Sequence, residues 1–168
     1  MSEFQRCTRC VMDNSSDPRI TFDENGHCNY CTDALERLPK TYFPNKKGAK
    51  FIENKLQSIK KNSADKKYDC VMGLSGGLDS SYLAMLGKKW DLRVLAVHID
   101  DGFDTDISKH NIEKLVEATG FDYEVIKPHE EQFHDLLKSY IRAAVPGIDN
   151  PQDNVLFAFL YKKIKQYN

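Results

Sequence analysis

The chain has 168 residues, a length that fits one domain, or one domain with a small appendage. Its 24 Lys and Arg residues nearly balance 25 Asp and Glu, and the net charge of −1 excludes an overall attraction to nucleic acid or anionic membranes. The 40% of apolar residues argues against a disordered chain, and no run of about 18 apolar residues, which a membrane span would need, is present. Because no apolar stretch of an export signal follows Met1–Arg6, we expect a cytoplasmic protein.

Four of the five cysteines form two pairs near the start of the chain. Two residues separate Cys7 from Cys10, and Cys28 and Cys31 repeat this spacing after 17 intervening residues. The pattern matches a four-thiolate metal site, in which two short loops supply two ligands each. Four thiolates suit Zn²⁺, which we expect here, and they also suit an iron–sulfur cluster. No coordination position stays open, so the metal would be structural rather than catalytic.

The segment between the two cysteine pairs predicts a turn that brings them together. Ile20–Phe22 alternates in polarity, and Asp23–Gly26 has the composition of a hairpin turn just before Cys28. Two disulfides would be the alternative, but without an export signal we expect the thiols to stay reduced. We assign residues 1–38 to this metal module, which is too small to fold without the metal.

A linker and a basic helix follow, and we assign residues 39–67 to them. Two prolines and an asparagine indicate a linker over residues 39–47, and apolar residues at helical spacing from Ala49 to Ile59 predict an amphipathic helix. Lys40–Lys67 holds nine lysines against two acidic residues. This basic patch is either the solvated face of the helix or a surface for a phosphate-rich partner.

From residue 68 strands and helices alternate, and we assign residues 68–168 to one α/β domain. A nearly continuous apolar run over Val94–Ile99 is expected of a parallel strand covered on both faces. The order of elements predicts a parallel sheet with right-handed crossovers, and we expect the sheet to be incomplete because a fourth strand would begin where the sequence ends. The predicted elements are strands over Tyr68–Leu74, Val94–Ile99 and Asp122–Lys127, and helices over Ser80–Lys89, Ile112–Thr119, Phe133–Ala144 and Asn154–Gln166.

Apolar side chains on two of these helices predict which surfaces are buried. Tyr82, Leu83 and Leu86 are expected to face inward from the helix over Ser80–Lys89. The last helix is apolar nearly all round over Val155–Tyr161, which is typical of a helix covered on every side. We therefore expect the last helix to be buried.

The turn between the first strand and its helix carries the chemistry. Two adjacent glycines let the backbone turn tightly and approach a ligand closely. The backbone amides would then point outward at a helix N-terminus, and three serine hydroxyls add further donors. A glycine-rich turn of this kind binds phosphate at the carboxyl edge of a parallel sheet. The residues expected to hold phosphate are Ser75, Gly76, Gly77, Leu78, Asp79, Ser80 and Ser81.

The type of phosphate site follows from what the loop lacks. Neither the Walker pattern nor the dinucleotide fingerprint is present, and no lysine is available to follow a transferred γ-phosphate. The sequence S-G-G-L-D-S-S resembles the pyrophosphate loop (PP-loop) of the N-type ATP pyrophosphatases, which include GMP synthetase, asparagine synthetase and tRNA thiolases. The resemblance implies that ATP adenylates a carbonyl-type oxygen, pyrophosphate leaves, and ammonia or sulfur displaces AMP.

A wider resemblance covers nearly the whole chain. R-C-x-x-C-V-M at Arg6–Met12, I-T-F-D-E-x-G-x-C-x-x-C at Ile20–Cys31, the loop at Ser75–Ser80 and the segment Pro151–Asn154 resemble the N-terminal part of the N-acetyl sugar amidotransferases of lipopolysaccharide biosynthesis. This implies an adenine nucleotide alpha hydrolase-like fold that uses ATP and Mg²⁺. It also implies conversion of the acetamido group of a nucleotide-linked N-acetyl sugar to an amidine, with ammonia supplied by a glutaminase partner.

Two aspartates are the candidate catalytic residues. Asp79, beside the polyphosphate, would coordinate Mg²⁺, or would cap the helix. Asp100 ends the second strand at the edge that faces the ligand, and would bind Mg²⁺ or nucleotide, or serve in the turn alone. As in related folds, the backbone from Val97 to Ile99 would contact adenine. His98, inside this strand, is expected to be a hydrogen-bonded core histidine.

Two other functions stay open. A tRNA-thiolating enzyme would use the lysine-rich segment to bind the tRNA backbone. Such enzymes carry cysteines after the loop, whereas Cys70 is the last cysteine of this sequence. The third interpretation is a non-catalytic module that binds zinc and senses nucleotide, and the intact phosphate loop counts against it.

Overall fold

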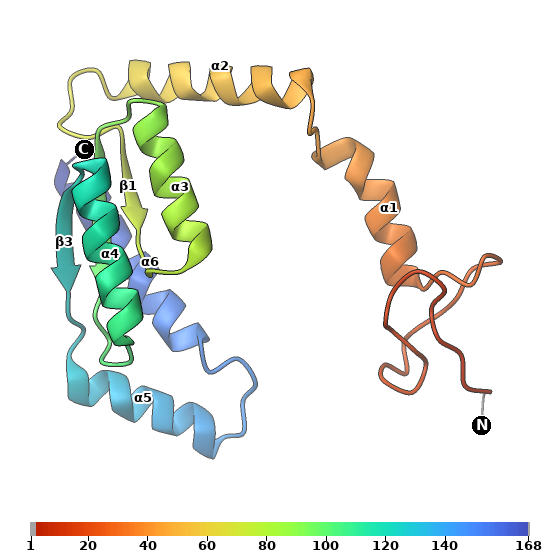
Figure 1. Ribbon diagram of the computed structural model, residues 1–168. Helices are drawn as coiled ribbons and strands as arrows, with labels where there is room; N and C mark the ends of the chain where they lie inside the picture. Colours follow the sequence, from red (N-terminus) through yellow and green to blue (C-terminus); the bar gives the residue numbers. More distant parts are fainter. Residues whose placement is uncertain (1–2, 168) are drawn as a thin grey trace. The chain divides into compact units, whose positions relative to one another are not determined.

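The computed structural model describes residues 3–167 (Figure 1). The chain divides into two compact units, Met1–Asn54 and Lys55–Asn168, and each has a core of its own. The boundary falls within helix α2, Lys46–Asn62. Within the described residues, none of the helices is both long and apolar enough to cross a membrane.

The first unit is built around its cysteines, which form its core together with Ile20. An isolated antiparallel bridge joins Phe22 to Cys28, and the backbone N–H of Asp23 donates to the carbonyl of His27. The hairpin expected between the two cysteine pairs is therefore present. Helix α1, Asn29–Thr41, begins directly after Cys28 and was not expected from the sequence.

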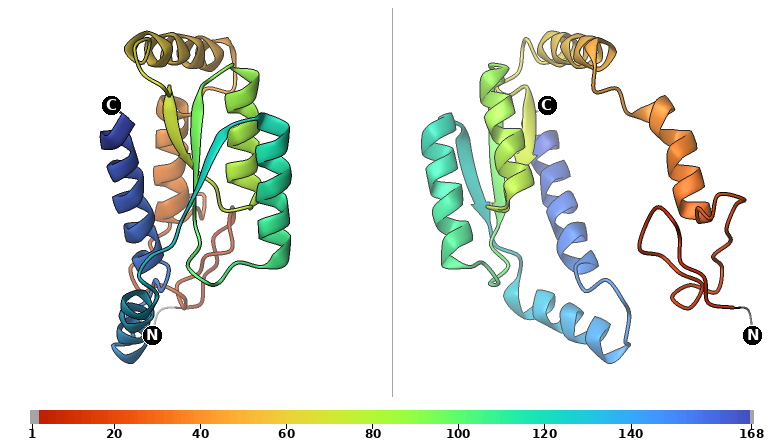
Figure 2. Two further views of the ribbon diagram at one scale, coloured as in Figure 1. Left: turned by 90° about the vertical axis from the view of Figure 1, so that its left-hand side faces the viewer. Right: turned by 45° about the vertical axis from the view of Figure 1, so that its right-hand side comes forward.

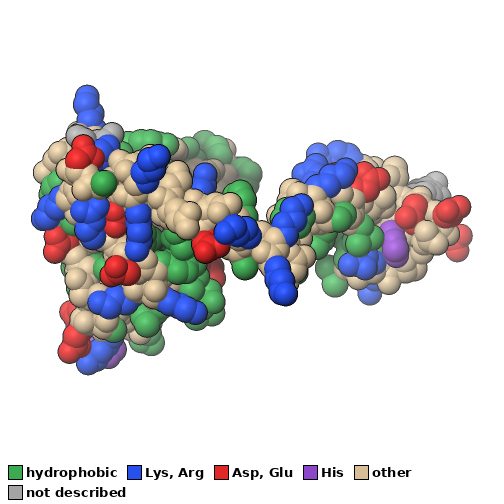
Figure 3. Space-filling model, turned by 90° about the horizontal axis from the view of Figure 1, so that it is seen from above, with side chains coloured by type: hydrophobic (Ala, Val, Ile, Leu, Met, Phe, Trp, Pro, Cys, Tyr) green, Lys and Arg blue, Asp and Glu red, His purple; other side chains and the backbone are tan. Residues whose placement is uncertain are grey.

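Helix α2 forms where the sequence predicted an amphipathic helix, and none of its residues is buried. Its lysines therefore lie in solvent, and Lys50 pairs with Glu53 on the same helix at 2.9 Å. In Lys55–Asn168, the face shown in Figure 3 carries Lys and Arg side chains interspersed with acidic and hydrophobic ones. This arrangement fits a solvated surface, and the partner suggested for the lysine-rich segment stays a prediction.

The second unit is a three-stranded parallel sheet with helices on both faces, as the sequence predicted. Helices α3 and α4 cover one face and α6 covers the other (Figures 1 and 2). The strands lie in the order β1-β2-β3, and Met72 pairs with Ala96, which in turn pairs with Tyr123. The elements are β1 (Cys70–Gly73), α3 (Leu78–Lys89), β2 (Val94–Ile99), α4 (Asp106–Thr119), β3 (Asp122–Ile126), α5 (Glu130–Arg142) and α6 (Asn150–Tyr167).

The central strand and the helix that follows it agree most closely with their sequence signals. Every residue of β2 is buried, because it pairs on both edges and is covered on both faces. Thr105 caps α4 by accepting from the backbone N–H of Ser108, and Gly120 ends it in the left-handed conformation. These two residues fix where α4 begins and ends.

Two expectations about buried helix faces were wrong. In α3 the buried residues are Ala84 and Gly87, whereas Tyr82 and Leu83 are exposed, and Leu86 alone of the three expected inward residues is partly buried. Small residues let α3 lie close to the sheet, so Tyr82 and Leu83 face outward. Helix α6 packs one face against the sheet and leaves Phe157 and other apolar side chains of its opposite face exposed.

Candidate functional site

The carboxyl ends of β1 and β2 border a pocket of about 360 Å³. Ser75 and Ser80 of the PP-loop line one side of the pocket, and His98 and Ile99 line it from the end of β2. The first turn of α6 closes the pocket with Gln152 and Asp153. The loop expected to hold phosphate therefore borders the pocket at the sheet edge where parallel α/β folds bind ligands.

Gly76 sets the shape of the PP-loop. Its φ of +72° lies in the left-handed region, and a β-carbon there would stand 2.4 Å from the carbonyl oxygen of Ser108. The side chain of Asn111 donates a hydrogen bond of 3.1 Å to the Gly76 carbonyl oxygen. The loop thus rests directly on the backbone of α4, and no side chain fits between them.

The first turn of α3 offers unpaired hydrogen-bond donors. Within residues 3–167, no protein acceptor meets the backbone N–H groups of Leu78, Asp79 and Ser80. Ser75 Oγ and Ser80 Oγ lie 3.1 Å apart and close the base of the loop. Unpaired N–H groups at a helix N-terminus attract an anion, and this is the arrangement expected for the loop. Gly77 occupies the N-cap, so the capping role considered for Asp79 is not observed.

Asp100, which was expected to bind Mg²⁺ or nucleotide, forms an ion pair with Lys127. Its carboxylate lies 2.9 Å from Nζ of Lys127, which lowers its pKa, and it does not line the pocket. Val97 is fully buried, and its carbonyl oxygen accepts from the backbone N–H of Leu74 within the sheet. Ile99, by contrast, lines the pocket. Adenine contact by this strand and metal binding by Asp100 stay predictions.

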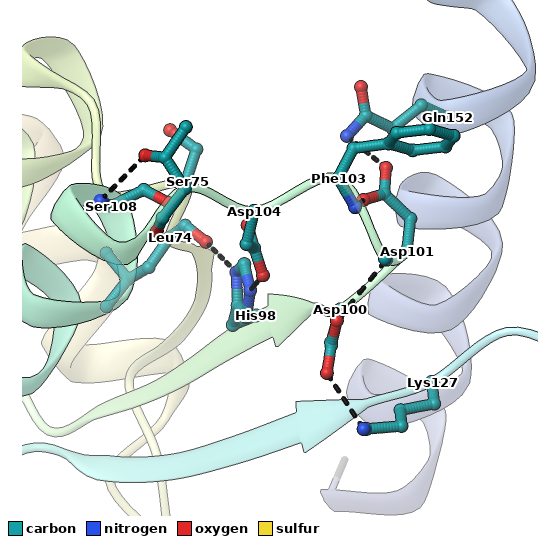
Figure 4. Close-up of polar contacts among 12 residues, drawn as sticks. Leu74, Ser75, His98, Asp100, Asp101, Phe103, Asp104, Ser108, Lys127 and Gln152 are labelled. Carbon is teal, nitrogen blue, oxygen red and sulfur yellow. Dashed lines mark hydrogen bonds and ion pairs between the residues drawn. The ribbon is translucent and has the colours of Figure 1, made fainter.

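Four polar side chains that form hydrogen bonds at or beside the pocket were not singled out as site residues: His98, Asp101, Asp104 and Gln152. His98 contacts Asp104 in the loop before α4, and Asp101 accepts a 2.6 Å hydrogen bond from Nε2 of Gln152 (Figure 4). Asp101 is buried, so this bond fastens the start of α6 to the end of β2. The sequence signal was the segment Pro151–Asn154, which carried part of the family resemblance without a role for Gln152.

A second pocket of about 280 Å³ adjoins the first at Gln152. Gln152 lines both pockets, so the two are neighbours across one side chain. The second pocket is lined mainly by apolar side chains of α5, of the loop before α4 and of the loop after α5: Phe133, Leu137, Phe103 and Ile148.

The four predicted metal ligands lie together in the first unit. The Sγ atoms of Cys7, Cys10, Cys28 and Cys31 all lie within 4.8 Å of one another. The distance from Cys7 to Cys31 is 3.9 Å, and that from Cys10 to Cys28 is 3.7 Å. Four zinc–sulfur bonds of about 2.3 Å place tetrahedral sulfurs about 3.8 Å apart. The cluster therefore has the dimensions of a site for one metal ion.

Backbone donors prepare this cluster for negative charge. Although burial opposes it, the backbone N–H groups of Cys28 and Arg9 donate to Cys7 Sγ and lower the pKa of this thiol to about 6. Burial and the neighbouring thiols raise the pKa of Cys31 to about 12. Four thiolates this close repel one another, so a cation is the group that would stabilise them together.

Comparison with known proteins agrees with the architecture. A family model described as NAD synthase matches residues 46–155. The NH3-dependent NAD synthetase from Campylobacter jejuni superposes with a TM-score of 0.52 and 20% identity, covering 71% of this chain and 53% of that chain. The NMN synthetase from Francisella tularensis gives a TM-score of 0.52 and 23% identity, covering 71% of this chain and 51% of that chain. No curated protein matches.

These matches show which features the chain shares with known proteins. The chain spans about half the length of the two synthetases, and at these identities the likeness shows a common fold. The family match supports the expected relation to the PP-loop ATP pyrophosphatases, and none of the matches reaches the sugar specificity. The matched segment contains the PP-loop, all three strands and the polar groups of the pocket, and it takes in more than half of the sequence. The chain therefore belongs to the NAD synthase family.

Proposed function

We propose that this chain binds ATP and adenylates a carbonyl-type oxygen of an acceptor, from which ammonia then displaces AMP. The pocket at the carboxyl edge of the sheet carries the proposal, because it joins the unpaired donors of the PP-loop to open space beside them. The N–H groups at the start of α3, with the hydroxyls of Ser75 and Ser80, hold the β- and γ-phosphates. Pyrophosphate held in this way is a leaving group, and the α-phosphorus is the point of attack.

The charges around the pocket fit the use of Mg²⁺. No lysine or arginine of the described chain lines it, whereas Asp104 and Asp153 do, and Asp79 lies in the loop. Carboxylates beside a polyphosphate repel it unless a cation lies between them. Asp79 and Asp153 are the groups that would hold Mg²⁺, which would supply charge neutralisation for the leaving pyrophosphate.

The cysteine cluster fits Zn²⁺ as a structural ion. Its sulfur spacing suits a single tetrahedral ion, whereas the four ligands of an iron–sulfur cluster are divided among two or four irons and do not all lie this close together. All four positions are taken by protein sulfurs, so the ion has no site for a substrate. Its contribution is to hold the hairpin and the start of α1 together.

For the acceptor we propose a nucleotide-linked N-acetyl sugar, activated at its acetamido oxygen and converted to an acetamidino sugar for surface polysaccharide. Two features support this. The cysteine motifs and the PP-loop together resemble the N-acetyl sugar amidotransferases, and the apolar pocket beside Gln152 adjoins the nucleotide pocket where an acceptor must enter. Ammonia comes from a glutaminase partner in this proposal. Ammonia-dependent chemistry also appears in the name of the structurally similar NAD synthetase.

The test is pyrophosphate release from ATP and Mg²⁺ by the natural full-length protein, with ammonium and one acceptor at a time. The acceptors are UDP-N-acetyl sugars, bulk tRNA and the carboxylic acid precursor of NAD. Stimulation by a sugar nucleotide is the expected result. Stimulation by tRNA alone would mean that the acceptor is tRNA and the reaction thiolation, and it would give the lysine-rich segment a function. Stimulation by the NAD precursor alone would mean that the protein has NAD synthase activity. No release with any acceptor, with ATP still bound, would favour a nucleotide-sensing module.

A further inference from the structure

His98 lies at the centre of a hydrogen-bonded link between two loops that border the nucleotide pocket. Its imidazole is buried at the end of β2 and lines the pocket. Nδ1 lies 2.8 Å from the carbonyl oxygen of Leu74, the residue before the PP-loop, and Nε2 lies 2.7 Å from Oδ2 of Asp104 (Figure 4). Asp104 precedes Thr105, the cap of α4.

Both partners of the imidazole are hydrogen-bond acceptors. A backbone carbonyl has no proton to give, and an ionised carboxylate accepts only. Neutral histidine has one N–H donor and one bare nitrogen, so it would leave one of these two short contacts without a proton. Both contacts are satisfied together if both ring nitrogens carry protons, and His98 would then be an imidazolium paired with the Asp104 carboxylate.

This link fastens the PP-loop to α4 at a second point. Asn111 of α4 already holds the carbonyl of Gly76, inside the loop. Through His98, the carbonyl of Leu74 at the start of the loop is tied to Asp104, just before the same helix. The N–H donors at the start of α3 follow directly after these two fixed carbonyls, so their position depends on both ties.

We propose that His98 is a positioning residue of the ATP-dependent reaction. As an imidazolium it ties Leu74 to Asp104 and holds the PP-loop donors where they bind pyrophosphate. The proposal rests on the function proposed above, and His98 touches no reacting atom in this role. Asp104 and Asp153 are the other ionisable side chains that line this pocket.

The protonation of the ring is tested by NMR on protein labelled with ¹⁵N-histidine, without nucleotide. The His98 signal is identified as the one absent from His98→Gln. We expect protons on both ring nitrogens in the native chain and on one nitrogen in Asp104→Asn, whose amide donates to Nε2 in place of accepting. A native His98 with one protonated nitrogen would overturn the imidazolium.

The positioning role is tested by pyrophosphate binding with Mg²⁺ in two variants of one residue. Asp104→Asn keeps a hydrogen bond to the ring, and we expect an affinity within about threefold of the native value. Asp104→Leu removes the tie, and we expect about a tenfold loss, the size of one lost hydrogen bond to a charged group. Equal affinity in Asp104→Leu and the native chain, or an equal loss in both variants, would overturn the role.

Arg93→Gln is the matched control, because it breaks the Asp69–Arg93 ion pair at the opposite end of β2. It should lower the stability of the fold and leave the affinity for pyrophosphate unchanged. A tenfold loss of affinity in Arg93→Gln would show that the binding assay reports stability alone, and would overturn the positioning role. Failure of the native chain to bind pyrophosphate would refute the proposed function together with the positioning role. Binding by the native chain and by Asp104→Leu alike would refute the positioning role and leave the proposed function standing.

Discussion

At Gly76 the backbone adopts a φ of +72°, and a β-carbon added there would stand only 2.4 Å from the carbonyl oxygen of Ser108. Two separate costs therefore oppose any other residue at this position: backbone strain and a clash with the main chain of α4. A β-carbon added at the neighbouring Gly77 would make a single close contact of 3.3 Å, to Oγ of the flexible Ser75 side chain. The close approach to α4, more than the turn itself, is what requires glycine in this loop.

The variant Gly76→Ala tests this statement. Strain at positive φ and displacement of the loop from α4 should together lower the free energy of unfolding by about 2–4 kcal/mol, measured by urea denaturation. Gly102→Ala is the matched control, since Gly102 has a φ of +88° and a β-carbon added there would meet no atom within 4 Å. It should cost about 1 kcal/mol, from strain alone. Equal losses in the two variants would contradict the clash with Ser108.

The residues of the candidate site differ in how far the sequence could predict them. The PP-loop was found because its glycines and serines are consecutive and follow an apolar strand. Asp104 follows His98 by six residues, whereas Gln152 comes from α6, which only the folded chain brings to the same pocket. Asp100 was chosen because it ends a strand, but a neighbouring strand supplies Lys127, a partner that its own segment does not reveal.

At the scale of elements, patterns that a single segment carries were predicted best. The strand Val94–Ile99 has the bounds expected from its apolar run, and α4 ends at the expected glycine. Helix α1 carries apolar residues at helical spacing, Cys31, Ala34, Leu35 and Leu38, and was missed because its segment was assigned to the metal module and Pro39 to a linker. The faces of α3 and α6 were misjudged because the choice of buried face depends on the sheet beside them rather than on the helix sequence.

We expect α1 and the hairpin to depend on a metal bound by the cysteine cluster, because this core consists largely of the proposed ligands. We expect about one zinc ion per chain, and loss of the zinc and of the first unit's structure in Cys28→Ser, whose native side chain is fully buried. Metal analysis and the NMR signals of residues 3–54 measure these effects. Cys70→Ser, outside the cluster, should keep the zinc. A metal-free chain with a folded hairpin would refute the structural role.

At the scale of the second unit, ionised carboxylates join elements that are far apart in the sequence. Asp69 binds Arg93 at 2.7 Å where β1 and β2 begin, and Asp122 accepts a 2.6 Å hydrogen bond from Tyr68. Glu124 of β3 pairs with Lys163 of α6. These partners lower the pKa of each carboxyl group below its ordinary value. Ion pairs therefore add to the apolar core in holding strand to strand and sheet to helix.

Acid should weaken this unit, and Asp69 should contribute most. The guanidinium of Arg93 lowers the pKa of the Asp69 carboxyl although burial opposes it, and Ser63 also donates to it. A carboxyl group whose pKa is lower in the folded than in the unfolded state stabilises the fold above its unfolded pKa of about 3.9. That stabilisation is lost as the pH falls below this value toward the folded pKa.

The measurement is the free energy of unfolding in urea at several pH values from 7 down to 2.5. Asp69→Asn should be less stable than the native chain at pH 7, and the gap should narrow as the pH falls, because the native carboxyl group then becomes protonated too. Asp65→Asn, at an exposed position without an ion pair among the described residues, is the matched control and should leave only a small gap at pH 7. A gap for Asp69→Asn that stays constant down to pH 2.5 would mean that the Asp69–Arg93 pair contributes no pH-dependent stability.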